Sequence, residues 1–121
     1  MNTLDSSASV ASVASPQGPA GTDARLLLPA VLTSKEASDA LRMLVQALPR
    51  QAGRVAVVEC GALGQLDSAA IAVLLETRRQ ALLAGIGFEL RDAPEKLTAL
   101  ARLYGVGELL TTPVGPQVDV A

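Results

Sequence analysis

Three short apolar segments alternate along the chain with three longer segments in which apolar residues recur at helical spacing. The apolar segments span residues 25–32, 55–60 and 86–91, and a helical pattern follows each one after a short linker. Alternation of this kind favours parallel strands that are connected by helices. The chain is therefore predicted to be an α/β domain with a mostly parallel β-sheet and helices packed against it.

The residue types in the predicted strands indicate their places in the sheet. Pro29 interrupts residues 25–32, and a proline within a strand points to an edge or a bend. Residues 55–60 form a β-branched run, which is typical of a strand buried on both faces. The only cysteine, Cys60, ends this run, so it is interpreted as a small buried residue rather than a redox group.

Polar residues ahead of the helical patterns predict where the helices begin. Thr33 with Glu36, and Asp92 with Glu95, match the spacing of a capping box. Pro94 falls in the predicted first turn of the third helix, where proline is tolerated. The expected apolar faces are Ala37, Leu41, Leu44, Val45 and Leu48 in the first helix, Ile71, Leu74, Leu75 and Leu82 in the second (residues 68–84), and Leu97, Leu100, Ala101 and Tyr104 in the third. The residues expected to end these helices are Pro49, Gly85 and Gly105.

Composition divides the chain into one domain and two tails. Residues 1–22 are rich in Ser, Ala, Gly and Pro and are predicted to be a flexible tail, in which residues 9–15 could add a short edge strand. Residues 23–112 form the predicted domain, which closes with the short apolar segment 106–110. Residues 113–121 are predicted to be a loose C-terminal tail.

Charge and aromatic content argue against nucleic acid as a ligand. The formal net charge is −2, and the chain has one Phe, one Tyr and no Trp. It therefore lacks both the basic patch that meets phosphates and the aromatic platform on which single-stranded bases stack. Arg78 and Arg79 are interpreted as part of a solvated helix face. We expect no nucleic-acid partner.

The residue types also give little support to catalysis or cofactor binding. The chain has no histidine, which is the commonest general base and metal ligand, and its only lysines are Lys35 and Lys96. Gly61 and Gly64 are not a phosphate-binding loop, because the Gly-Lys-Ser/Thr ending is missing. We expect a non-enzymatic protein with no catalytic residue, no cofactor and no metal.

The hydropathy pattern favours a protein that stays outside the bilayer. The longest uninterrupted apolar run, residues 69–75, is far shorter than the roughly 20 residues that a transmembrane helix needs. The first residues also lack the basic segment and apolar core of a secretory signal. We expect a soluble cytoplasmic protein with no direct membrane insertion.

The pair Asp67-Ser68 lies where an apolar strand passes into an apolar helix. Both residues are good N-cap residues, so either one can satisfy the free backbone N–H groups at the start of the second helix. The Ser68 hydroxyl has two natural uses. It can cap the helix and nothing more, or it can be a contact or phosphorylation point at the positive end of the helix dipole.

Three features together resemble the STAS-domain family. The first is the strand–loop–Asp67-Ser68–helix arrangement, which is similar to the Asp-Ser or Asp-Thr motif of the family. The second is Gly-Ile-Gly-Phe-Glu-Leu at residues 85–90, and the third is the close Leu-Ala-Arg-Leu-Tyr-Gly-Val at residues 100–106. The close is similar to that of the MlaB branch of the family. Many members carry a glycine where this chain has Ala70, and the usual N-terminal hairpin is altered around Pro29.

The resemblance implies a STAS-type fold and a binding function. It implies an accessory subunit that docks on the cytoplasmic ATPase of a phospholipid-transporting ABC complex, and through the ATPase on the permease, at the inner membrane. The partner-binding residues that it implies are Gln65, Leu66, Asp67, Ser68 and Ala69. A phosphate on Ser68 would gain from the helix dipole but would crowd a docked partner.

A second function fits the same residues. In an anti-sigma factor antagonist, the partner is a kinase-type anti-sigma factor and phosphorylation of Ser68 releases it. The Asp67-Ser68 pair is compatible with either function, whereas the tyrosine-containing close favours the transporter subunit. A STAS scaffold within a larger signalling assembly is a third interpretation.

Overall fold

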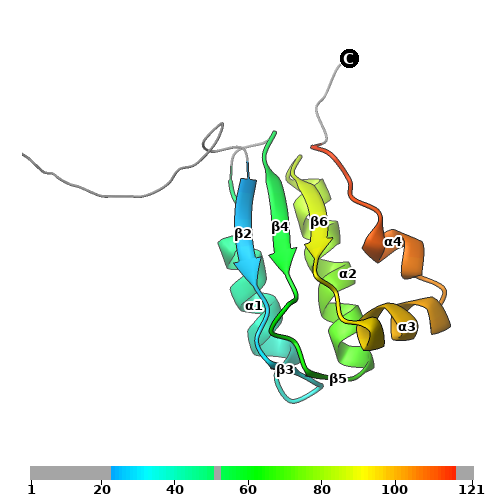
Figure 1. The fold of residues 1–121 in the computed structure, drawn as a ribbon. Coiled ribbons are helices and arrows are strands. Elements are labelled where there is room, and N and C mark those ends of the chain that lie inside the picture. Colours follow the sequence, from blue (N-terminus) through cyan, green and yellow to red (C-terminus); the bar gives the residue numbers. More distant parts are fainter. Residues whose placement is uncertain (1–22, 51–52, 117–121) are drawn as a thin grey trace, which may run out of the picture.

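Three parallel strands form the centre of the structure (Figure 1), a computed structural model that describes residues 23–50 and 53–116. In chain order the elements are β2 (Asp23–Leu27), β3 (Val31–Leu32), α1 (Ala37–Ala47), β4 (Val55–Glu59), β5 (Gln65–Leu66), α2 (Ser68–Leu83), β6 (Gly87–Arg91), α3 (Glu95–Leu103) and α4 (Gly107–Thr111). The predicted α/β class with a parallel sheet is confirmed. The predicted N-terminal tail 1–22, with its alternative edge strand 9–15, lies outside the described residues.

The main sheet has the order β2-β4-β6, and both pairings are parallel. The prediction of one strand over residues 25–32 was wrong, because β2 ends at Leu27 and the chain bends around Pro29. Proline has no N–H with which to continue a ladder. The following residues form β3, which pairs in parallel with β5 in a separate two-stranded sheet.

Helices α1 and α2 lie against one face of the main sheet, while α3 and α4 lie beyond the β6 edge (Figure 1). The core between helices and strands is built almost entirely from aliphatic side chains around the single phenylalanine, Phe88. Aliphatic residues that are less than 2% exposed there include Leu32, Leu44, Val58, Leu74, Ile86, Leu97 and Leu110. Burial of each large side chain of this kind contributes about 1.5–3 kcal/mol to folding.

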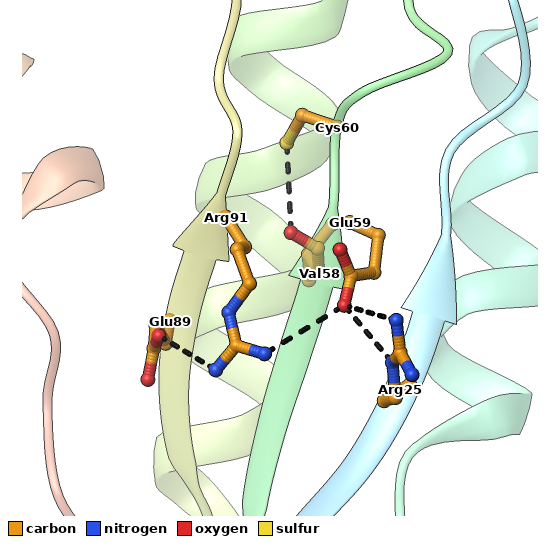
Figure 2. A network of polar contacts seen from close by, with 6 residues as sticks. All are labelled: Arg25, Val58, Glu59, Cys60, Glu89 and Arg91. Atoms are coloured by element: carbon orange, nitrogen blue, oxygen red, sulfur yellow. Dashed lines mark hydrogen bonds and ion pairs between the residues drawn. The ribbon is translucent and has the colours of Figure 1, made fainter.

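The other face of the sheet carries a row of charged side chains (Figure 2). Val57, in the central strand, is 1% exposed. Glu59 in the central strand accepts a hydrogen bond of 2.9 Å from Arg25 in β2, and Arg91 in β6 lies 3.9 Å from the same carboxylate oxygen. Arg91 is also paired with Glu89 at 3.1 Å. The predicted burial of residues 55–60 on both faces is thus confirmed for Val57, whereas Glu59 is only partly buried.

Cys60 is fully buried at the end of β4, as expected. Its thiol lies 3.6 Å from the Val58 carbonyl oxygen, to which it donates (Figure 2). Burial raises the pKa of the thiol to about 11. The group is therefore protonated at neutral pH and unreactive, since the thiolate is the nucleophile.

Of the two predicted capping boxes, one forms in part and the other is absent. Glu36 rather than Thr33 is the N-cap of α1, and its N–H is bonded to the Thr33 carbonyl oxygen instead of the hydroxyl. The Glu36 carboxylate accepts hydrogen bonds from the N–H (2.8 Å) and the hydroxyl (2.6 Å) of Thr33, and these bonds hold the pKa of Glu36 below its ordinary value. Asp92 instead has φ +58°, and Pro94 is the N-cap of α3, so Glu95 opens the helix rather than closing a box. The predicted place of Pro94 within the first turn was also wrong.

The C-terminal part of the described chain is more ordered than the sequence predicted. The apolar closing segment contains the short helix α4, and Val114 then pairs with Phe88 in an antiparallel bridge on the outer edge of β6. Its two backbone hydrogen bonds measure 2.8 and 2.9 Å. The interpretation of residues 113–121 as a loose tail is therefore wrong for Val114.

This bridge requires a glycine at position 87. A Cβ atom there would lie 2.5 Å from the Val114 carbonyl oxygen and 2.9 Å from the Gly115 carbonyl carbon, and both atoms belong to backbone. We expect Gly87→Ala to destabilise the domain by about 1–3 kcal/mol in urea unfolding, because a crowded site must shift its backbone. Gly64→Ala is the control, since the nearest atom there is 4.0 Å away. Equal stability of the two variants would contradict this account.

Candidate functional site

The start of α2 is fixed by the side chain of Asp67. Asp67 has an extended backbone, with φ −138° and ψ −166°, and its Oδ1 accepts the N–H of Ala69 at 2.8 Å. This geometry makes Asp67 the N-cap, which satisfies one of the free donors of the first turn. Ser68 is then the first helical residue. Of the two capping assignments that the sequence left open, the structure selects Asp67.

The same carboxylate also ties α2 to the turn that leads into α1. Its Oδ2 accepts the N–H of Ser34 at 3.2 Å. Ser34 lies in the turn in which Thr33 and Glu36 are bonded to each other. The starts of α1 and α2 are therefore held side by side at one end of the molecule, and Figure 1 shows both near β3 and β5.

The predicted partner-binding residues do not all face solvent. Gln65, Asp67 and Ser68 are exposed, and Ala69 is half-buried. Leu66 is buried and belongs to the hydrophobic core, so its side chain is not available to a docked protein. Leu66 therefore packs in the core below this surface, and the surface itself contains the other four predicted residues: Gln65, Asp67, Ser68 and Ala69.

Ser68 lies at the rim of an apolar hollow between α2 and the end of α3. The hollow has a volume of about 300 Å³ and is lined by Ser68, Ile71, Ala72, Leu75, Tyr104 and Val106. The Tyr104 side chain is 55% exposed beside it, and the neighbouring Leu103 is 77% exposed. The hollow and these exposed side chains form an apolar contact area, with the hydroxyl-bearing residues Ser68 and Tyr104 at its edge.

A second hollow lies on the other side of α2, toward α1. It measures about 360 Å³ and is lined by Ala37, Ser38, Leu41, Ala69, Ala72, Val73 and Glu76. Ala72 lines both hollows, so the exposed ridge of α2 between them is built from small side chains: Ser68, Ala69 and Ala72. Small residues allow another backbone to approach closely.

Ala70, which stands at the family's glycine position, does not lie on this ridge. Its side chain is fully buried in the core. The methyl group therefore fills interior space and leaves the outer surface of α2 unchanged.

The polar side chains that line the two hollows are Ser68, Tyr104, Ser38 and Glu76. Within residues 23–50 and 53–116, the Ser68 hydroxyl makes no hydrogen bond, and no three His, Cys, Asp or Glu residues are grouped to hold a metal ion. Glu76 at the edge of the second hollow is held by Arg79, at 2.9 and 2.6 Å, and by Gln80 at 2.9 Å. These bonds lower the pKa of Glu76 to about 2, so it is ionised at neutral pH.

Sequence reasoning missed the residues that α3 and the segment after it bring to the site. Tyr104 was predicted to join the apolar stripe of its helix as a boundary residue with a hydrated hydroxyl, and its 55% exposure agrees with that interpretation. Its place at the rim of the hollow, together with Val106, was not predicted. Ser68, Ala72 and Leu75 follow one another at i, i+4 and i+7. This spacing is the signal that could have indicated a shared outer stripe on α2.

A comparison with protein-family models gives one match. The model described as "Mlab, STAS domain" matches residues 19–111, which include every element from β2 to α4. No curated protein matches the sequence significantly. In the part of the chain that the structure describes, every helix is too short or too polar to cross a membrane.

The assignment of Asp67 as the cap can be tested by stability measurements. Asp67→Ala removes both the cap and the bond to Ser34, so we expect a loss of about 1–2 kcal/mol in the free energy of unfolding. Asp67→Asn keeps an acceptor oxygen, so its free energy of unfolding should fall by less than that of Asp67→Ala. Ser68→Ala should change stability by less than about 0.5 kcal/mol. A larger cost for Ser68→Ala than for Asp67→Ala would show that Ser68 is the cap.

The lowered pKa of Glu76 predicts a pH effect whose sign is fixed. A carboxylate with a folded pKa near 2, against an ordinary value of 4.5, contributes stability above about pH 4.5 and loses it as the pH falls toward 2. NMR titration of the Glu76 side chain should give this midpoint. In Arg79→Gln the pKa of Glu76 should rise toward 4.5. An unperturbed midpoint in the original protein would show that the pair does not form in solution.

Proposed function

Because the chain belongs to the STAS-domain family, we propose that it is a non-enzymatic accessory subunit that docks on the ATPase of a phospholipid-transporting ABC complex. Two observations support the family branch. The matching family model is described as Mlab, and the matched residues include the Leu-Ala-Arg-Leu-Tyr close at residues 100–104. STAS domains are in general binding domains rather than catalysts, which is the class of function that this surface suits.

The proposal depends above all on the small-residue ridge of α2 between two hollows. A protein that docks across Ser68, Ala69 and Ala72 can place one apolar side chain in each hollow, of about 300 and 360 Å³. The exposed Leu103 and Tyr104 extend the apolar area toward α3. Docked protein would remove these groups from water, and this burial drives association.

The proposed effect on the ATPase is allosteric. A subunit that only binds can change the ATPase rate if it favours one ATPase conformation over another, and such coupling is typically about 1–3 kcal/mol. Docking through the ATPase also gives the proposed location, at the cytoplasmic side of the inner membrane. In this proposal the chain contacts the ATPase, the ATPase contacts the permease, and the chain and the permease do not contact each other directly.

The anti-sigma factor antagonist is the second candidate, and the free Ser68 hydroxyl favours it. Ser68 is exposed, and Asp67 already provides the cap, so a kinase could reach the hydroxyl without first breaking the helix start. A phosphate there would meet the positive end of the helix dipole and the negative Asp67 carboxylate together. Constitutive association with an ATPase separates the first function from this phosphorylation cycle.

Substitutions on the ridge test the proposed docking. We expect Ser68→Asp and Ala72→Arg to weaken co-purification of the ATPase at least about tenfold, because each places a charge in a contact that must lose its water. Ser68→Ala should bind normally. Ala99→Arg, at an exposed position of α3 outside both hollows, is the matched control.

The readouts are the yield of ATPase recovered with each variant and the ATPase rate of the complex. All variants should unfold at the same denaturant concentration as the original chain. If Ala72→Arg and Ala99→Arg recover the same amount of ATPase, the ridge is not the docking surface. Recovery of a kinase-like anti-sigma factor, with phosphate on Ser68, would establish the second function instead.

A further inference from the structure

A third groove lies at the opposite end of α2 from Ser68. It has a volume of about 430 Å³ and is lined by Arg78, Arg79, Leu82, Leu83 and Val114. Leu82 lies fourteen positions after Ser68 in the helix, which corresponds to about 21 Å along the axis. The two hollows extend along α2 to Leu75 and Glu76, so the third groove is a neighbouring site one turn further on, and it shares no lining residue with them.

One wall of the groove is apolar and partly open to solvent. Leu83 is 71% exposed although it is a large aliphatic residue, and Leu82 beside it is half-buried. The opposite wall is Val114, which the bridge to Phe88 fixes on the edge of β6. Both walls are thus anchored, one on a helix of sixteen residues and the other on the sheet.

The charge of the groove is positive. Arg79 is paired with Glu76, but within residues 23–50 and 53–116 no carboxylate lies within ion-pair distance of Arg78. The Nε atom of Arg78 is also shielded from solvent and has no hydrogen-bond partner there. A carboxylate that enters the groove would therefore meet the terminal nitrogens of the Arg78 guanidinium, which can form charge-assisted hydrogen bonds with it.

We propose that this groove binds an acidic, partly apolar peptide segment of a partner protein. A carboxylate of the segment pairs with Arg78, and an adjacent aliphatic side chain covers Leu82, Leu83 and Val114. The charge of the groove and its apolar wall both complement such a segment, whereas a neutral peptide would leave Arg78 without an acceptor.

The shape of the site favours a peptide over a membrane surface. A membrane-binding patch is usually a convex cluster of several lysines and arginines. Here the positive groups are two arginines in a concavity, and one of them is already paired with Glu76. A bilayer cannot enter a groove of this size, while an extended segment can.

Binding of a defined peptide tests the proposal with the full chain. The probe is fluorescein-labelled Gly-Glu-Leu-Glu-Val-Glu-Gly, and the comparison peptide has Gln in place of each Glu. Fluorescence anisotropy should show at least about fivefold tighter binding of the Glu peptide. Amide NMR shifts should concentrate at Arg78, Leu82, Leu83 and Val114. Equal binding of the two peptides, or no binding of either, would overturn the proposal.

Two variants locate the binding, each with a matched control. Arg78→Gln should lower the affinity for the Glu peptide at least about fivefold. Arg42→Gln on α1 should leave this affinity unchanged. Leu83→Asp changes an exposed residue, so the fold is retained, and it should also abolish binding. Leu27→Asp, at another exposed leucine that lines none of the three sites, should leave binding unchanged. Unchanged affinity in both Arg78→Gln and Leu83→Asp would overturn the proposal.

Two further results would assign the groove to another occupant. Anionic phospholipid vesicles that displace the peptide, and that bind the original chain but not Arg78→Gln, would make it a membrane contact. Self-association of the original chain that Leu83→Asp abolishes would make it an interface between two copies. The ATPase experiment on the α2 ridge is unaffected by any of these outcomes.

Discussion

The two hydrogen bonds that the Asp67 carboxylate accepts link the starts of the two helices that cover one face of the sheet. One bond holds the first turn of α2, and the other holds the turn that leads into α1. Because α1 and α2 together cover one face of the main sheet, their relative position determines how the aliphatic core between them closes (Figure 1). The hollow between α1 and α2 lies directly beside this junction. Asp67 therefore positions the surface without having to be its main contact.

Because Asp67 caps the helix, the hydroxyl of the neighbouring Ser68 is left for contact or modification. In an isolated helix, a serine at such a position is most simply a cap, and a cap is already engaged with backbone N–H groups. Here the aspartate takes that role, and Ser68 stands one residue further along on the exposed ridge. A hydroxyl that is not needed for the helix start can be modified or contacted at little cost to the fold. Both proposed functions depend on this separation of structural and contact roles.

Most of the fold could be predicted from the sequence because the periodicity is local. The stops at Pro49, Gly85 and Gly105 were predicted from single residues, and both glycines have a positive φ, the backbone conformation typical of a glycine that follows a helix. The small β3–β5 sheet could not be predicted, since two-residue strands carry almost no pattern and pair only through the tertiary fold. The prediction of a capping box at Asp92 was wrong because Asp92 has a left-handed backbone, φ +58°, and Pro94 is the N-cap of α3. The hollow beside Ser68 depends on Tyr104 and Val106, which only packing of α3 against α2 brings to it.

The bridge between Phe88 and Val114 also limits how the sheet can grow. It occupies the outer edge of β6 at that point, and α4 contacts the same strand. Within the described residues, the outer edge of β2 has no such partner. A sheet must be open on both sides to build an endless fibre, because each added unit has to offer a new edge. Where Val114 pairs with Phe88, a strand of another molecule cannot add to β6, so growth of the sheet through that point is blocked.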